Sequence, residues 1–170
     1  MTFTTLKYTL DADGIANVVF DEPGSPVNTM KPAWQEDMAA LADRLQADLP
    51  SLKGVILTSA KSTFFAGADL KGVLALTEQD VPSCFKGIEH LKHSFRRIET
   101  MGKPVVALLE GAALGGGWEL ALMAHARFAL HDPQLRFGLP EVTLGLIPGA
   151  TGITKMTRLL GLMAVQPYLM

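Results

Sequence analysis

The 170-residue sequence predicts a single α/β domain in which most strands pair in parallel. Short apolar runs such as 52–60 and 103–111 alternate with longer segments whose apolar residues recur at helical spacing. Strands that alternate with helices along a chain favour a parallel sheet. Apolar residues make up 48% of the chain and charged residues 19%, so the chain has the material for a packed core.

The first half of the chain predicts a β-hairpin, an amphipathic helix and a buried strand. Asp and Gly residues between the first two strands tolerate the tight backbone of a hairpin turn. Apolar residues from Trp34 to Leu45 recur at helical spacing, and Pro50 closes that segment. The expected elements are a strand at 3–10, a turn at 11–14, a strand at 15–20, a helix at 32–46, a strand at 52–60 and a loop that turns at Gly67.

The second half predicts three helices and several short strands. An apolar stripe indicates the first helix and leaves its Lys and Arg residues to solvent; it consists of Phe85, Ile88, Leu91, Phe95 and Ile98. The next strand leads through a glycine triplet into strong helix formers. The expected elements are a helix at 82–101, a strand at 103–111, a glycine turn at 115–117 with a helix after it, strands at 126–130 and 135–138 around a turn at 131–133, a segment at 139–149 and a final helix from about 150 to 160.

Charge and cysteine content exclude several classes of function. A net charge of −2 without a Lys/Arg-rich run argues against a nucleic-acid partner. Cys84 is the only cysteine, so the chain holds no internal disulfide or cysteine-based zinc site, and we expect a cytoplasmic protein. The N-terminus lacks the pattern of a signal peptide, and Glu110 interrupts the apolar stretch 104–117, so membrane insertion is not expected.

Three turns near predicted strands are the candidate chemical centre, at 67–69, 115–117 and 139–141. A glycine triplet that leads into a helix exposes unpaired N–H groups and the positive end of the helix dipole. Such groups stabilise an oxyanion, and removing one donor of this kind costs an enzyme on the order of 3 kcal/mol. Gly116 lies in this triplet, and Ala68 after Gly67 offers a second N–H.

Two glutamates accompany these turns. Glu119 lies in the first turn of the expected helix among apolar neighbours, where an acidic residue most often complements the helix dipole. Glu141 follows Pro140 and, alone, fits a surface loop equally well. If the two carboxylates share a partly dry pocket, mutual repulsion separates their pKa values, so that one acts as a base and the other donates a proton.

Several other patterns do not support a cofactor or metal site. The glycines of 111–117 do not follow the dinucleotide-binding order, and 145–155 does not match a phosphate-binding loop. His90 and His93 are three residues apart on a helix but lack clustered carboxylates, so solvated histidines are the simpler interpretation.

Three segments resemble the crotonase, or enoyl-CoA hydratase/isomerase, superfamily: FFAGADLK at 64–71, GAALGGGWELAL at 111–122 and FGLPEVTLGLIPG at 137–149. The resemblance covers nearly the whole chain and is nearest to the hydratase part of multifunctional fatty-acid oxidation α-subunits. FDEPGSPVNTM at 20–30 and the 22-residue spacing from position 119 to position 141 also resemble that branch. It implies a crotonase-like ββα spiral core, with residues 1–170 as the N-terminal core of a hydratase domain.

The resemblance also implies roles for residues. By this resemblance Ala68 and Gly116 donate to the thioester oxygen, Glu119 activates water and Glu141 protonates the α-carbon, with shared or reversed roles of the two glutamates as the alternatives. The substrate, an acyl-CoA, needs no cofactor here, and NAD enters only if dehydrogenase domains follow. The implied substrate-binding residues are Ala66, Gly67, Asp69, Leu70, Lys71, Gly115, Pro140 and Gly149; Lys71 is equally consistent with an ordinary surface lysine.

The chain departs from the superfamily pattern in two places. Where family members often read PGxGGTQR, residues 148–155 read PGATGITK, so we expect different packing under the acyl pocket. The apolar end GLMAVQPYLM lacks the C-terminal helices of the family, and we expect a fragment truncated before them, whose full-length form is a homo-oligomer or part of a fatty-acid oxidation complex. The leading function is hydration of enoyl-CoA, with double-bond isomerisation as a side activity. Hydrolysis, decarboxylation or dehalogenation of a thioester, and non-catalytic acyl-CoA binding, are the alternatives.

Overall fold

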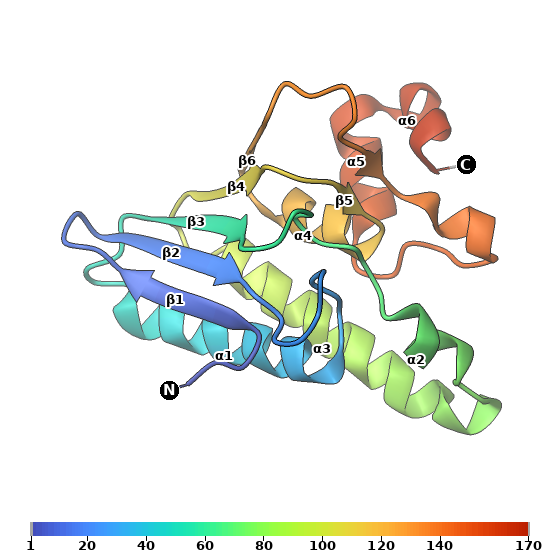
Figure 1. The fold of residues 1–170 in the computed structure, drawn as a ribbon, viewed down its shortest axis with the longest axis horizontal. Helices are drawn as coiled ribbons and strands as arrows, with labels where there is room; N and C mark the ends of the chain where they lie inside the picture. The colour runs from blue at the N-terminus through green and yellow to red at the C-terminus, as the bar shows by residue number, and fades with distance from the viewer. Residues whose placement is uncertain (1, 170) are drawn as a thin grey trace.

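The computed structural model describes residues 2–169 and contains a five-stranded sheet in the order β1-β2-β3-β4-β6 (Figure 1). β1 and β2 form an antiparallel hairpin, and the other neighbours pair in parallel. This confirms the predicted α/β class and the largely parallel pairing. The strands are β1 (Leu6–Leu10), β2 (Ile15–Phe20), β3 (Gly54–Ser59), β4 (Val105–Leu109) and β6 (Ala126–Ala129).

A second, two-stranded sheet lies beside the first and supports the candidate site. It pairs β5 (Ala113–Leu114) with β7 (Phe137–Gly138) in parallel, and Phe65 forms an isolated bridge to Ala113. The strand predicted at 135–138 is therefore only two residues long and does not join the main sheet. β5 was not predicted, because it is too short to leave a pattern in the sequence.

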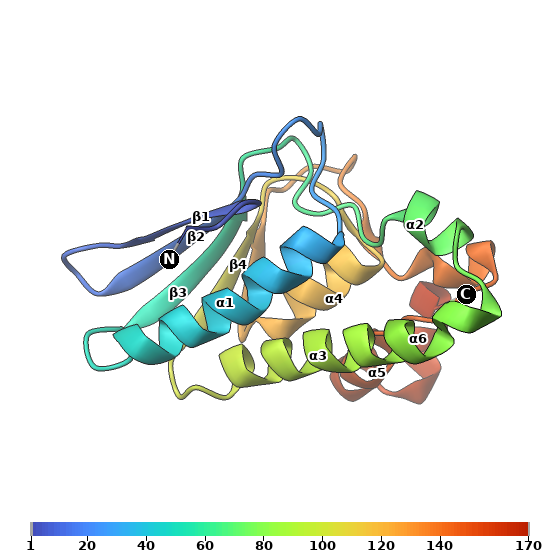
Figure 2. The ribbon, with the colours of Figure 1, turned by 90° about the horizontal axis from the view of Figure 1, so that it is seen from below.

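The helices follow the predicted order, with two additions. α1 and α3 lie side by side beneath the sheet (Figure 2). α2 and α6 were not predicted: α2 has five residues, and α6 contains Pro167, which is unfavourable inside a helix. The helices are α1 (Pro32–Asp48), α2 (Leu70–Leu74), α3 (Val81–Glu99), α4 (Gly116–Met123), α5 (Gly152–Leu160) and α6 (Leu162–Leu169), with 3₁₀ turns η1 (Glu78–Asp80) and η2 (Pro140–Leu144).

The main core lies between the sheet and the helices α1 and α3. Alternate residues of β2 are buried, which places one face of the sheet against these helices. Phe20, Trp34, Phe65 and Phe95 form a chain of aromatic contacts with ring centroids 4.9–6.4 Å apart. This aromatic cluster fixes the end of β3 and the Phe65 loop that leads to the candidate site.

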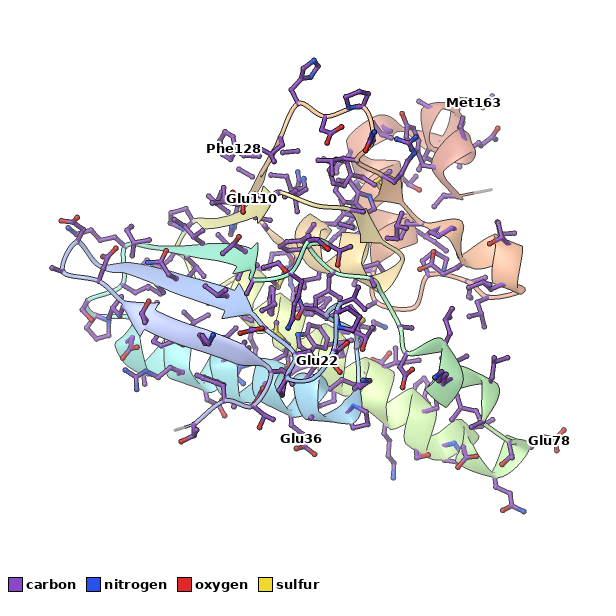
Figure 3. All side chains as sticks on the ribbon, viewed as in Figure 1. Glu22, Glu36, Glu78, Glu110, Phe128 and Met163 are labelled. Carbon is purple, nitrogen blue, oxygen red and sulfur yellow. The ribbon has the colours of Figure 1, made fainter. Side chains whose placement is uncertain are left out.

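Only part of the predicted stripe on α3 is buried. Leu91, Phe95 and Ile98 belong to the core, but Phe85 is 65% exposed and Ile88 38% exposed. Further apolar side chains, including Phe128 and Met163, lie at the periphery of the molecule (Figure 3). None of the helices described within residues 2–169 is both long and apolar enough to cross a membrane.

Candidate active site

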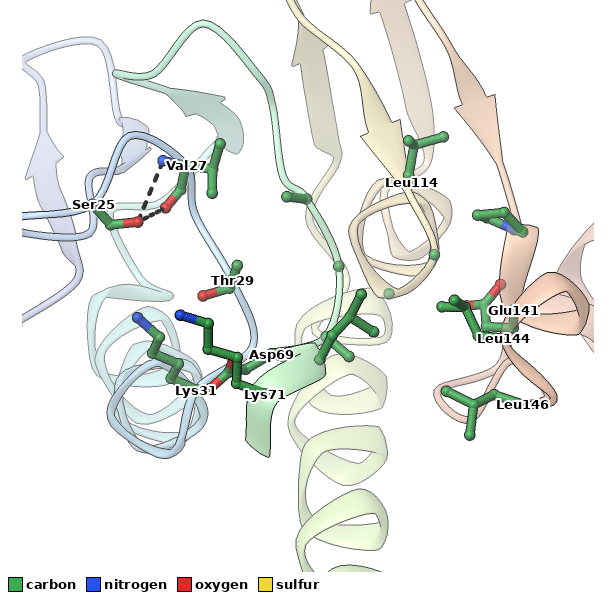
Figure 4. Close-up of a pocket in the computed structure, with 17 residues that line it drawn as sticks. Ser25, Val27, Thr29, Lys31, Asp69, Lys71, Leu114, Glu141, Leu144 and Leu146 are labelled. Atoms are coloured by element: carbon green, nitrogen blue, oxygen red, sulfur yellow. Dashed lines mark hydrogen bonds between the residues drawn. The ribbon is translucent and has the colours of Figure 1, made fainter. Parts of the chain in front are cut away.

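The predicted turns meet around a cavity of about 660 Å³ (Figure 4). Its wall is formed by the loop after β2, the loop that leads into α2, the start of α4 and the turn η2. Figure 4 shows Glu141, Leu144 and Leu146 on one side, opposite Lys31, Asp69 and Lys71. Ten of the predicted site residues line it: Ala66, Gly67, Ala68, Asp69, Leu70, Lys71, Gly115, Gly116, Pro140 and Glu141.

Two predicted residues do not line this cavity. Glu119 is 2% exposed and lies inside the fold. Gly149 is exposed, and a Cβ built on it would meet only Ile88 Cδ1, at 4.0 Å. The structure thus brings the two turns of Ala68 and Gly116 together with Glu141 at one surface, while Glu119 lies in the interior, where the charge of Glu141 acts on it.

The two proposed oxyanion donors lie on turns that approach each other closely. Gly67 has φ +92°, and a Cβ built on it would lie 2.8 Å from Leu114 O and 3.4 Å from Gly116 N. Glycine is therefore required at position 67 both by its conformation and by the close approach of the second turn. The N–H groups of Ala68 and Gly116 have no partner among the hydrogen bonds of residues 2–169.

The start of α4 is held against the loop after β3. A Cβ on Gly117 would lie 2.2 Å from Phe65 O, so only glycine fits at this contact. Leu114 N donates to Phe65 O at 3.3 Å, and Gly115 N donates to Gly138 O at 2.9 Å. These contacts fix the N-terminus of α4, whose free N–H groups and positive dipole end favour a negative charge in the cavity.

Asn28 supports the other turn, and no pattern in the sequence singled it out as a site residue. Its side chain is 1% exposed, accepts from Glu22 N at 2.9 Å and donates to Ser59 Oγ at 2.9 Å. Its backbone oxygen accepts from Ala66 N, and Met30 N donates to Gly67 O, both at 2.9 Å. The segment 28–30 is therefore the backbone partner of the turn that presents Ala68.

Glu119 is buried and bound to the start of α5. Its Oε1 accepts from Ala150 N at 2.9 Å and from Gly152 N at 2.7 Å. Burial raises the pKa of Glu119; the two N–H donors oppose this rise, and the charge of Glu141 adds to it. The expectation that Glu119 serves its own helix is incomplete, because its carboxylate also accepts from Gly152 N, the first residue of α5, and from Ala150 N just before that helix.

Glu141 lies in the cavity wall on η2. A Cβ on Gly115 would lie 3.1 Å from Glu141 Oε1, so the carboxylate sits directly against the glycine turn. Its Oε2 is buried and has no hydrogen-bond partner within residues 2–169. Burial also raises the pKa of Glu141, with a backbone hydrogen bond acting in the opposite direction. Both carboxylates near the turns thus bind protons more readily than an exposed glutamate does.

An ion pair at the cavity edge, between the half-exposed Lys31 and the buried Glu22, was also missed. Lys31 donates to Glu22 Oε1 at 2.5 Å, and Glu22 Oε2 accepts from the N–H and the hydroxyl of Thr29. Burial alone would raise the pKa of Glu22, but the donors Lys31 and Thr29 outweigh it and lower that pKa. The cavity is also lined by Ser25, Val27, Thr29 and Lys31, to which no site role was assigned from the sequence. The resemblance of segment 20–30 to the family was the signal that could have identified them.

The arrangement suits stabilisation of an oxyanion together with proton transfer. It combines two free backbone donors, a carboxylate in the cavity wall and a second carboxylate held by fixed donors. Among residues 2–169, no group of three or more His, Cys, Asp or Glu side chains is placed to hold a metal ion.

Comparison with known proteins shows which family the chain resembles. Residues 11–170 match the family described as enoyl-CoA hydratase/isomerase. The fatty acid oxidation complex subunit alpha of Idiomarina loihiensis is 39% identical over 151 residues, and that of Shewanella amazonensis 38% identical over the same length. Each match covers 88% of this chain and 21% of the relative, so the chain spans about one fifth of the curated relatives it matches.

Solved structures share the fold. The structure of enoyl-CoA hydratase from Bacillus anthracis has a TM-score of 0.84 at 27% identity, over 97% of this chain and 62% of that one. The enoyl-CoA hydratase structure from Geobacillus kaustophilus has a TM-score of 0.83 at 27% identity, over 95% and 58%. The predicted resemblance and the crotonase-like core are confirmed. The chain belongs to the enoyl-CoA hydratase/isomerase family and has its α/β crotonase fold.

Proposed function

We propose that this chain carries the hydration site for trans-2-enoyl-CoA in fatty-acid oxidation. The observation that supports it is a cavity lined by the two unpaired N–H groups of Ala68 and Gly116 and by Glu141, with Glu119 buried behind it. Burial raises the pKa of both carboxylates. Addition of water to an α,β-unsaturated thioester needs these resources: a site for the enolate oxygen and groups that move two protons.

In the proposed reaction the thioester oxygen accepts hydrogen bonds from Ala68 N and Gly116 N. Water attacks the β-carbon, and charge collects on that oxygen as an enolate, where each donor contributes on the order of 3 kcal/mol. Glu119 takes the proton from water: burial raises its pKa and makes its carboxylate a stronger base, although its two N–H donors oppose this rise. Glu141, whose Oε2 has no acceptor or donor within residues 2–169, protonates the α-carbon from the same side.

The rest of the cavity wall suits the other parts of the substrate, its coenzyme A moiety and its acyl chain. Lys71 lies at the cavity and makes no ion pair among residues 2–169, so its ammonium is available for a phosphate of coenzyme A. Leu70, Leu144 and Leu146 supply an apolar surface for the acyl chain. Since the relatives are subunits of fatty acid oxidation complexes, we further propose that residues 1–170 are the N-terminal core of a hydratase domain that works in such an assembly.

The test is hydration of crotonyl-CoA, followed by the loss of ultraviolet absorbance of the conjugated thioester. Glu119→Gln and Glu141→Gln should each lower kcat by about 10²–10⁴. Glu110→Gln is the matched control, because Glu110 is exposed and lies outside the cavity wall (Figure 3). It should retain the rate of the unsubstituted chain.

Other outcomes would redirect the proposal. If the chain binds crotonyl-CoA without turnover, a non-catalytic acyl-CoA-binding role replaces hydration. Release of free coenzyme A, detected with a thiol reagent, would instead indicate thioester hydrolysis. If neither glutamine substitution changes the rate of hydration, the assignment of proton transfer to Glu119 and Glu141 is wrong.

A further inference from the structure

Thr151 has an unusual backbone beside the buried carboxylate of Glu119. It is the only residue other than glycine with a positive φ among residues 2–169, at φ +105° and ψ −5°. A β-branched side chain in this region is strained, because its Cβ crowds the neighbouring backbone. The Thr151 hydroxyl is also buried without a partner within residues 2–169, so no hydrogen bond of the side chain holds the residue in this conformation.

The residues on both sides of Thr151 hold Glu119. Ala150 N and Gly152 N both donate to the same oxygen, Glu119 Oε1, at 2.9 and 2.7 Å. A left-handed residue between two N–H groups turns them toward one point, and such a backbone concavity binds anions. The left-handed conformation of Thr151 is therefore what allows one carboxylate oxygen to accept both hydrogen bonds.

We propose that Thr151 is a positioning residue for Glu119, and that the strained turn 150–152 and the ionised carboxylate hold each other in place. The two charge-assisted hydrogen bonds to the carboxylate stabilise the left-handed conformation of Thr151. When Glu119 is protonated, these hydrogen bonds weaken, and they offset less of the strain energy of the turn 150–152. The state of the Glu119 proton is thereby coupled to the geometry at the start of α5.

Few other groups act on this carboxylate. Glu141 on η2 is the charged side chain that influences Glu119. Lys155 on α5 is paired with Glu99 on α3, so its charge is already neutralised. The Glu119 carboxylate packs tightly against Gly152, because a Cβ built on Gly152 would lie 2.9 Å from Glu119 Oε1. The backbone of 150–152 is thus the main structural control on the orientation of Glu119.

The substitution Thr151→Gly tests the backbone strain, and Thr151→Val tests the buried hydroxyl. Thr151→Gly keeps the concavity, since glycine adopts a positive φ without strain. It should raise Tm by about 2–6 °C. Protonation of Glu119 then no longer relieves strain, so Glu119 should titrate at lower pH than in the unsubstituted chain. Thr151→Val is the matched control: it keeps the branched shape and the strain but removes the unpaired hydroxyl, and should leave the titration of Glu119 unchanged.

The readout is the carboxyl ¹³C NMR titration of labelled glutamate, with the Glu119 signal assigned by its loss in Glu119→Gln. The catalytic meaning of this coupling rests on the proposed function, but the NMR titration needs no activity, so the two can fail separately. In a double-mutant cycle, Thr151→Gly should raise Tm less in the Glu119→Gln background, where the carboxylate no longer enforces the strain. An unchanged titration in Thr151→Gly, an equal shift in Thr151→Val, or full additivity in the cycle would overturn the proposal.

Discussion

Replacement of Asn28 tests whether the loop after β2 supports the oxyanion turn. The Asn28 carboxamide is buried and contacts four groups: Glu22 N, Phe20 O, Ser59 Oγ and Phe64 O. Asn28→Ala removes all four contacts but leaves only two groups without a partner. Phe20 O still accepts from Ala60 N, and Ser59 Oγ still bonds Thr63 O and Lys61 N.

The expected loss follows from the two orphaned groups, Glu22 N–H and Phe64 C=O. A buried polar group that loses its partner costs about 1–3 kcal/mol, so the two orphaned groups of Asn28→Ala should lower the free energy of unfolding by roughly 2–6 kcal/mol. Under the proposed function, the same change should lower kcat for crotonyl-CoA, because residues 28–30 hold the Ala66–Gly67 backbone that presents Ala68 N.

Urea unfolding followed by circular dichroism measures the stability change. Ser59→Ala is the comparison variant, because it leaves Glu22 N and Phe64 O satisfied. The backbone groups that lose Ser59 Oγ, Lys61 N and Thr63 O, belong to half-buried residues, so this change should cost less than Asn28→Ala. If the free energy of unfolding of Asn28→Ala lies within about 0.5 kcal/mol of that of the unsubstituted chain, the loss of hydrogen-bond partners at Glu22 N and Phe64 O does not destabilise the fold as argued.

Three further predictions address the two glutamates and the cavity edge. Gly152→Ala places a Cβ 2.9 Å from Glu119 Cγ and from Leu139 Cδ1 and should cost about 1–3 kcal/mol in urea unfolding. Gly149→Ala, whose nearest neighbour is Ile88 Cδ1 at 4.0 Å, should cost far less, and equal losses would contradict the steric argument. Glu141→Gln should raise the free energy of unfolding at pH 8. Burial raises the pKa of Glu141 in the folded state, so this group contributes most to stability below the unfolded pKa of about 4.3. Its contribution is lost as the pH rises through the folded pKa. The gain should disappear in acid, and a gain that is constant with pH would argue against a buried ionised carboxylate. Lys71→Met should raise KM for crotonyl-CoA roughly three- to tenfold but not for a crotonyl-pantetheine thioester, which has no nucleotide. Lys86→Met on α3 is the control, and an equal rise in KM for both thioesters would exclude a phosphate contact.

Local patterns in the sequence were enough for the order of the five main-sheet strands and of helices α1, α3, α4 and α5, but not for the short elements β5, α2 and α6. The Asp and Gly residues of 11–14 form the predicted hairpin turn, in which Asp11 Oδ1 accepts from Asp13 N and Ile15 N and Gly14 has φ +84°. The helix predicted at 32–46 extends over Pro32–Asp48, and the one predicted at 82–101 over Val81–Glu99. These predictions succeed because turn chemistry and helical periodicity are set by residues within a few positions of one another.

The turns of the site could also be found from the sequence, since glycine clusters after strands are a local signal. Gly67 and Gly115 have the positive φ angles that such turns require, and Ala68 and Gly116 line one cavity. The roles of Glu119 and Glu141 depended on the motifs that resemble the family, because an acidic residue in a first helical turn or after a proline has simpler explanations.

Tertiary structure alone decided how these groups are held. Glu119 receives its hydrogen bonds from residues 31 and 33 positions away, and Asn28 reaches Phe64 across 36 positions. The strained residue Thr151 lies where the start of α5 meets a buried carboxylate from α4. The sequence by itself determined which turns and carboxylates this chain has. Packing between distant segments determined their burial, their hydrogen-bond partners and the direction of their pKa shifts, because desolvation and hydrogen-bond geometry arise only where those segments meet.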